Sequence, residues 1–180
     1  GAWWRWRPFL VVSGFLFNIL ISFWTLVIGT VAGAALGLGQ ISTFGPLRAF
    51  SWFTTQLFRN SPWLVILFIV LLALPFEFTI FGQTIRVPDW MKGVFGLSLP
   101  VMANISEVVR GAVQSVPTAQ WEAAESLAFS RRQILWQIIL PQCFKRMLPP
   151  WMNWYAILTM ATPLCSLLGI EEIITLSRQA

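Results

Sequence analysis

The chain has 180 residues, of which 57% are hydrophobic and only 11% are charged. A soluble domain carries about 25% charged residues, so this composition leaves too few charges to cover a water-facing surface. The net charge of +5 comes from short basic clusters beside apolar runs, not from a stripe of the kind that binds nucleic acid. Residues 8–47 and 147–170 contain no charged residue. Because about 20 apolar residues span a bilayer as a helix, we predict an all-α membrane protein, with residues 1–180 forming a single transmembrane domain.

The first predicted span covers about residues 9–38 and contains three regularly spaced glycines. Gly29, Gly33 and Gly37 recur every four residues and so share one face of a helix. Small residues at this spacing let two helix backbones approach closely. We interpret the glycines as a packing seam against a neighbouring helix or subunit. The alternative is that glycine is simply frequent in membrane helices.

The second predicted span covers about residues 47–74 and is interrupted by Arg59-Asn60-Ser61-Pro62. An Arg, an Asn and a Pro inside a span need partners or water, so this segment indicates a break or a functional kink. Alternatively, Arg59 lies near the membrane surface and its long side chain reaches the water there. The polar residues 75–92 that follow are predicted to form a loop.

The third predicted span, about residues 91–113, contains Asn104, Glu107 and Arg110. Glu107 and Arg110 are three residues apart, so they lie on the same helix face and can form an ion pair. Ionisable groups at membrane depth are candidates for a transport path or its gate. The alternative is that both residues lie at the membrane edge and anchor the span.

Residues 114–146 are predicted to be a loop that presents a short helix of small residues to a soluble partner. Pro117 suits the first turn of such a helix, and Ala119 and Ala123 lie four residues apart on one face. Residues 110–146 carry five basic and two acidic residues, so the positive-inside rule places them in the cytoplasm. Counting spans back from this loop places Arg5 and Arg7 outside, against the same rule.

The fourth predicted span covers about residues 150–168 and contains Thr159, Thr162 and Pro163. Pro163 removes a backbone donor and leaves the carbonyl of Thr159 without its helical partner. A discontinuous helix with free carbonyls can line a transport path, although a kink without function is also common in membrane helices.

The residue inventory argues against an enzyme. There is no His, and the two cysteines, Cys143 and Cys165, do not have the spacing of metal ligands. Without a catalytic or metal-binding constellation, we expect no catalytic residue, no metal and no cofactor on this chain.

Four segments, in order, resemble the permease subunits of bacterial ABC importers, in the branch that takes up polar amino acids. Glu122-Ala123-Ala124, within residues 114–142, is similar to the cytoplasmic EAA loop of that family. Residues 59–65 are similar to its Arg-Gly-Thr-Pro-Leu-Leu-Val segment, and residues 105–111 to its Tyr-x-x-Glu-x-x-Arg-Gly segment. Residues 148–150 with Asn153 also fit, and the resemblance extends over about residues 29–173.

The resemblance implies a helical bundle like the transmembrane domain of type I ABC importers, with about four spans present and a fifth missing at the C-terminus. It implies a multi-pass permease subunit in the bacterial inner (cytoplasmic) membrane, which forms the path for a polar amino acid. The implied partners are ABC ATPase subunits that hold ATP and Mg, a second permease subunit in a homo- or heterodimer, an external solute-binding protein and the lipid bilayer.

The resemblance also implies roles for two sets of residues. The residues that dock on the ATPase would be Glu122, Ala123, Ala124, Ala128, Ser130 and Arg131. Those of the translocation path or gate would be Arg59, Asn104, Glu107, Arg110, Thr159 and Thr162. Glu107 either accepts the ammonium group of the substrate or pairs with Arg110 at the gate, and we favour the gate.

Two expectations concern the docking helix. Ala124→Trp should abolish docking on the ATPase without unfolding the spans. The family has Gly at the position of Ala128, and Ala can replace it only where the backbone is not left-handed. Two alternative functions stay open: a permease for another small polar solute, such as an opine or a sulfonate, and a membrane anchor or sensor whose loop docks a soluble regulator.

Overall fold

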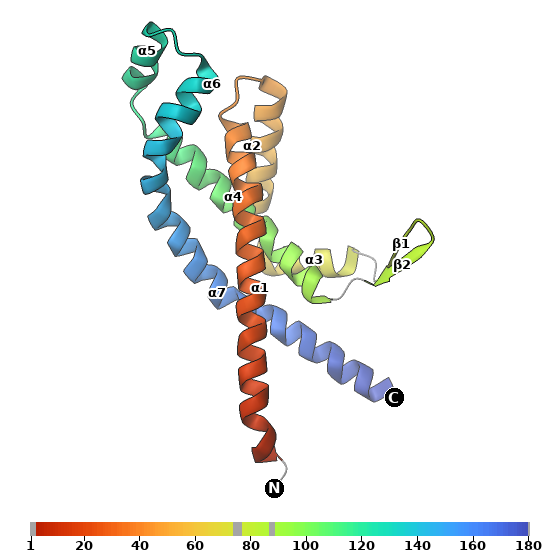
Figure 1. Ribbon diagram of the computed structural model, residues 1–180. Coiled ribbons are helices and arrows are strands. Elements are labelled where there is room, and N and C mark those ends of the chain that lie inside the picture. Colours follow the sequence, from red (N-terminus) through yellow and green to blue (C-terminus); the bar gives the residue numbers. More distant parts are fainter. Residues whose placement is uncertain (1–2, 74–76, 87–88, 180) are drawn as a thin grey trace.

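A computed structural model describes residues 3–73, 77–86 and 89–179, and this part of the chain is almost entirely helical (Figure 1), as predicted. The first half contains α1 (Trp3–Gln40), α2 (Gly45–Arg59), α3 (Trp63–Ala73), β1 (Glu77–Ile80) and β2 (Gln83–Arg86). The second half contains α4 (Asp89–Gln114), α5 (Thr118–Ser126), α6 (Arg131–Gln133), the π-helix η1 (Ile134–Ile139) and α7 (Leu140–Gln179). The helices α5 and α6 lie at one end of the molecule, and α1 begins at the other (Figure 1).

The helix α4 lies at the centre of the bundle and packs against α1, α2, α3 and α7. Its contact with α1 depends on the predicted glycine seam. A Cβ atom on Gly33 would lie 2.7 Å from both the carbonyl oxygen of Met102 and the Cβ of Ile105. Gly29 and Gly37 face Val101 and Val109 of α4 equally closely. The seam therefore brings two helices of the same chain together, and the missing side chains set their distance.

The second predicted span is divided into two helices, α2 and α3, which are bent by 104° relative to each other. The reason lies in the predicted break: Pro62 has no backbone N–H to continue the helix. The hydroxyl of Ser61 donates to the carbonyl of Leu57 at 2.7 Å, and the backbone N–H of Asn60 donates to the carbonyl of Gln56 at 3.1 Å. These two bonds cap the C-terminal end of α2.

The polar stretch predicted as a loop after α3 contains a hairpin. The strands β1 and β2 pair antiparallel, with Glu77 opposite Arg86 and Ile80 opposite Gln83. Thr and Ile residues on both sides of Phe81-Gly82 favour strands over a loop. The predicted loop over residues 75–92 therefore contains a hairpin and extends too far, since α4 already begins at Asp89.

The predicted coupling loop, residues 114–146, is also more regular than expected. It holds α5, α6 and η1 and ends inside α7, which continues as a helix across Pro163 to Gln179. The expectation of a discontinuous helix at Pro163 is therefore wrong for the backbone. The side chains of Thr162 and Cys165 lie outside the described residues.

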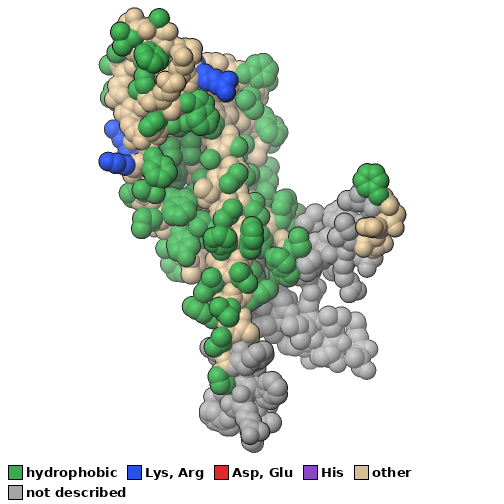
Figure 2. Space-filling model, in the orientation of Figure 1, with side chains coloured by type: hydrophobic (Ala, Val, Ile, Leu, Met, Phe, Trp, Pro, Cys, Tyr) green, Lys and Arg blue, Asp and Glu red, His purple; other side chains and the backbone are tan. Residues whose placement is uncertain are grey.

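The surface of the bundle is largely apolar (Figure 2), and in this view the Lys and Arg side chains lie toward the end that carries α5 and α6. Exposed apolar side chains line several helices, among them Phe15, Leu20, Trp52, Phe53, Phe68 and Leu72. Judged by length and hydropathy within the described ranges, Val12–Gln40 of α1 can cross a bilayer alone, and α2 with α3 can do so as one bent unit.

Candidate functional site

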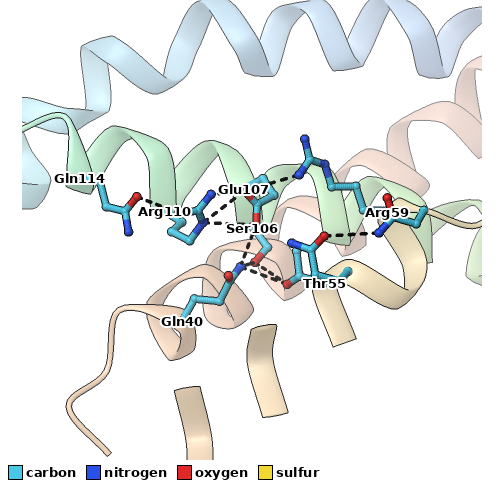
Figure 3. Close-up of polar contacts among 9 residues, drawn as sticks. Gln40, Thr55, Arg59, Ser106, Glu107, Arg110 and Gln114 are labelled. Atoms are coloured by element: carbon cyan, nitrogen blue, oxygen red, sulfur yellow. Dashed lines mark hydrogen bonds and ion pairs between the residues drawn. The ribbon is translucent and has the colours of Figure 1, made fainter. Parts of the chain in front are cut away.

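A group of polar side chains joins α1, α2 and α4 inside the bundle (Figure 3). We call it the polar cluster; its members are Gln40, Thr55, Arg59, Ser106, Glu107 and Arg110. The glutamine is the last residue of α1, and the threonine and Arg59 belong to α2. Ser106 and Glu107 are neighbours in α4, and Arg110 lies about one turn further along. The cluster thus connects the three helices at the point where α1 ends.

The buried half of the polar cluster is a hydrogen-bond network around Gln40. The side-chain amide nitrogen of Gln40 donates to Thr55 Oγ1 at 3.1 Å and to Ser106 Oγ at 2.7 Å. The two hydroxyl oxygens lie 3.0 Å apart and are themselves bonded. All three residues are buried. Because a buried polar group is costly unless it is paired, this network favours one rotation of each helix over others.

The charged half of the polar cluster is centred on the carboxylate of Glu107. Arg110 Nη2 lies 2.6 Å from Glu107 Oε2, and Arg110 Nε donates to the same oxygen at 3.1 Å. Arg59 Nη1 approaches that oxygen from α2 at 3.9 Å. The Glu107 side chain is 12% exposed, against 33% for Arg110 and 47% for Arg59. One carboxylate therefore holds guanidinium groups from two helices together.

Two of the predicted path residues lie elsewhere. Asn104 is buried and donates to the carbonyl of Pro100 at 2.8 Å, within α4. Thr159 donates to the carbonyl of Tyr155 at 2.9 Å, within α7, and lines a hollow of about 300 Å³ between α7 and α1. The polar cluster contains Gln40, Thr55 and Ser106, which the sequence analysis missed. The one signal for them was a glutamine at the end of a long apolar helix.

The second candidate region is the coupling segment, which we define as residues 117–133. It contains α5, which ends in a closely bonded turn. The N–H of Phe129 bonds to the carbonyl of Ala124 at 3.2 Å, and the N–H of Ala128 to that of Glu125 at 3.0 Å. This pair of bonds is a Schellman motif, in which the residue after the cap adopts a left-handed backbone. That residue is Ala128, with φ of 63°.

The left-handed Ala128 corrects an expectation from the sequence. Alanine was expected to preserve docking in place of the family's Gly if the backbone at this position were not left-handed, and that condition is not met. A left-handed conformation brings the Cβ atom too close to the following carbonyl oxygen and costs about 1–2 kcal/mol. The C-terminal turn of α5 therefore carries local strain that glycine would relieve.

A second correction concerns which alanine of α5 faces outward. Ala124 is only 4% exposed and belongs to an apolar cluster with Val116, Ile134, Ile139 and Cys143. Its side chain cannot reach a docking partner, and Ala124→Trp would disrupt the interior of the protein. The neighbouring Glu122 and Ala123 are exposed, so these two side chains are the accessible part of the motif.

The remaining predicted docking residues have local contacts that shape the segment. Ser130 caps α6 through a reciprocal pair of bonds with Gln133, at 3.3 Å and 2.9 Å. The guanidinium of Arg131 lies 5.1 Å from the ring centre of Trp121, and its Nη2 donates to the carbonyl of Ile41 at 3.4 Å. Both side chains are exposed and can contact a partner as well.

Three contacts join α7 to its neighbours: one reaches α5 in the coupling segment, and two reach the C-terminal end of α4 and the residue that follows it. The amide of Gln142 donates to Gln120 at 2.6 Å, and Arg146 donates to the hydroxyl of Ser115 at 2.8 Å. The Sγ of Cys143 lies 3.3 Å from the carbonyl oxygen of Ala112, and burial raises the pKa of this thiol in spite of the nearby Arg146. A displacement of α5 would therefore be transmitted to α4 and α7.

A groove separates the coupling segment from the end of α1. Its volume is about 730 Å³. Gln40 and Gln114 line it together with Trp121, Glu122 and Arg131, so the groove borders both the polar cluster and the coupling segment. Within the described ranges, no three His, Cys, Asp or Glu side chains are placed to hold a metal ion.

Comparison with known proteins matches residues 26–179 to the family described as binding-protein-dependent transport system inner membrane component. A probable amino-acid ABC transporter permease protein of Sinorhizobium fredii is 34% identical over 87% of this chain and 66% of its own length. A putative glutamine transport system permease protein of Rickettsia conorii is 34% identical over 93% of this chain and 74% of its own length.

The fold is similar to that of solved ABC importers. The crystal structure of an amino acid ABC transporter matches 93% of this chain and 75% of the other chain, with a TM-score of 0.78 and 26% identity. An inward-facing structure of a methionine ABC transporter covers 89% of this chain and 73% of the other, with a TM-score of 0.64 and 19% identity. The predicted fold, a type I importer transmembrane domain, is confirmed.

Proposed function

We propose that this chain, which belongs to the family of binding-protein-dependent transport system inner membrane components, is the permease subunit of an ATP-driven importer for a polar amino acid. The observation that carries the proposal is the exposed Glu122-Ala123 pair on α5, a helix bonded to α7 and packed against α4 at the positively charged end of the molecule. The names of the relatives support the choice of an amino acid as substrate.

The proposed assembly contains partners that supply what this chain lacks. Two ABC ATPase subunits would bind ATP and Mg in the cytoplasm, and a second permease subunit would complete the path. A solute-binding protein would deliver the substrate from outside. The permease would cross the bacterial inner membrane several times, with its large apolar surface in contact with lipid.

In this assembly the coupling segment would act as the link between ATP hydrolysis and the membrane helices. ATP binding would draw the ATPase subunits together and displace α5, whose contacts with α4 and α7 would pass the movement on. The polar cluster joins α4 to α1 and α2, so it would resist or release that movement. Glu107 forms ion pairs with Arg110 of its own helix and with Arg59 of α2. These pairs favour a role of Glu107 in a gate over a role in direct contact with the substrate.

The docking role is tested by Ala123→Trp, measured as co-purification of the permease with its ATPase in detergent. A bulky ring at an exposed position of α5 should lift the helix from the ATPase and abolish the complex, while the permease stays monodisperse. Ala156→Trp makes the same substitution at an exposed position of α7, within the predicted fourth span, and should leave the complex intact.

Normal co-purification of Ala123→Trp would contradict the docking role of α5. A wild-type permease that binds no ABC ATPase would overturn the proposed function as a whole and favour an anchor or sensor subunit. The substrate is tested separately, by uptake into proteoliposomes with a panel of polar amino acids, an opine and a sulfonate. Uptake of only the last two would contradict the amino-acid assignment.

A further inference from the structure

The tip of the β1–β2 hairpin holds a bulky aromatic residue in a conformation that such residues rarely adopt. Ile80 pairs with Gln83, so Phe81 and Gly82 alone form the turn. Their φ angles, 51° and 78°, are both positive, as in a type I′ turn. Asn-Gly is the favoured sequence for that turn, whereas a left-handed phenylalanine is a conformational outlier. Such an outlier points to a role for the side chain that offsets its local cost.

The ring of Phe81 is also completely exposed. Its relative accessibility is 103%, so it contributes nothing to the packing of this chain. Of the other hairpin residues whose exposure is described, Thr79, Gly82, Gln83 and Thr84 are all exposed, and each is polar or glycine and uncharged. An aromatic side chain within a polar, uncharged rim is typical of the centre of a protein–protein contact.

The position of the hairpin decides which partner it can meet. It precedes α4 directly, and the coupling segment follows α4 (Figure 1). The 26 residues of α4 measure about 39 Å, which exceeds the roughly 30 Å of the hydrocarbon core. If α4 crosses the bilayer as the predicted third span, the hairpin and the coupling segment lie on opposite sides of the membrane. With the coupling segment in the cytoplasm, Phe81 is outside, where the binding protein of a binding-protein-dependent system arrives.

We propose that Phe81 anchors the solute-binding protein on the outer face of this permease. The ring fills a shallow apolar depression of that protein, and the neighbouring Thr and Gln side chains form the polar rim of the contact. The strands add to it, because the sheet has only two strands among the described residues and each strand has one open edge. The inference rests on the proposed function, since it requires an external binding protein.

The test is the substitution Phe81→Asn in the complete transporter, reconstituted in nanodiscs with its ATPase. Asn-Gly forms the same type I′ turn without strain, so the variant removes the ring and keeps the hairpin. The measurement is the ATPase rate as a function of the concentration of the binding protein. We expect the half-maximal concentration to rise on the order of 30-fold, as for an interface anchor, with the basal rate unchanged. Phe81→Tyr keeps the ring and should resemble the wild type.

Each other outcome decides against the inference. An unchanged half-maximal concentration for Phe81→Asn would overturn it. A parallel fall of the basal and the stimulated rates would also overturn it and would assign the ring to the bilayer or to folding. Failure of the proposed function is distinguishable, because the wild-type complex would then show no stimulation by a binding protein. Thr84→Ala, on the same hairpin, controls for general effects of substitution and should change the half-maximal concentration less than threefold.

Discussion

The polar cluster and the coupling segment hold their shapes in different ways. In the cluster, Gln40 bonds to Ser106, 66 residues away, and both side chains are buried. In the coupling segment, the cap of α6 and the turn after α5 are made by residues three to five positions apart, and most of them are exposed. The polar cluster therefore depends on the relative placement of three helices. The cap and the turn of the coupling segment depend only on bonds between residues that are close in the sequence.

This difference suits the two proposed roles. A gate between helices needs bonds that exist in one arrangement of the bundle and break in another, and long-range bonds have that property. A docking element has to present the same surface to its partner in every state of the cycle, and locally closed turns provide this. Substitutions that act through helix placement should therefore have larger effects than substitutions within the segment.

The largest effect is expected at the glycine seam of α1, two helical turns before Gln40. Gly33→Ala would place a methyl group 2.7 Å from the carbonyl oxygen of Met102, and the helices would have to move apart. We expect the free energy of unfolding to fall by about 3 kcal/mol. The measurement is the midpoint of unfolding by SDS in mixed micelles. Gly14→Ala is the matched control, because no atom lies within 4 Å of the added methyl group; equal losses in both variants would contradict the seam.

An intermediate effect is expected at the charged half of the polar cluster. Glu107→Gln keeps the size of the side chain but removes the charge that holds Arg110, and should destabilise the fold by about 2 kcal/mol. Arg59→Gln removes the longer contact, in which Arg59 Nη1 lies 3.9 Å from Glu107 Oε2. Because the Arg59 side chain is 47% exposed, this variant should lower the free energy of unfolding by less than about 1 kcal/mol. The same SDS titration measures both. A larger loss for Arg59→Gln would mean that the link between α2 and α4, and not the pair within α4, carries the cluster.

The smallest effect, of opposite sign, is expected in the coupling segment. Ala128→Gly relieves the left-handed alanine and should stabilise the fold by about 1 kcal/mol. Ala123→Gly, in the preceding helix, should destabilise it by roughly 0.5–1 kcal/mol, because glycine is a poor helix former. The two variants differ only in position, so unfolding midpoints that shift in the same direction would show that the strain at Ala128 has no energetic consequence.

Much of the fold followed from the sequence. Apolar runs long enough for a bilayer predicted the helical class, and Arg59-Asn60-Ser61-Pro62 predicted the interruption between α2 and α3, though not the angle of 104°. The candidate site was predicted in part. The spacing of Glu107 and Arg110 is a property of any helix, so their contact was foreseeable. The involvement of Gln40 and Thr55 was not, because nothing in an apolar helix or in α2 indicates which residues it will face.

The coupling segment shows the same division on a smaller scale. Its residue types indicated a short helix with a partner, but the orientation of that helix was misjudged. Ala124 and not Ala123 faces inward because the helix lies against Val116, Ile134 and Cys143, which belong to other elements. The left-handed Ala128 could not be read from the residue type either, since alanine gives no indication of it, whereas glycine would have.

By itself, the sequence determined that this is a helical membrane protein with a short exposed helix at its positively charged end, because hydropathy and charge act over runs of neighbouring residues. Only the tertiary structure decided which polar side chains meet between the helices, which alanine of α5 is accessible, and that the turn of a hairpin fully exposes the ring of Phe81. Those features depend on the rotation and packing of helices against each other. Contacts between distant residues set that packing, and no local pattern records them.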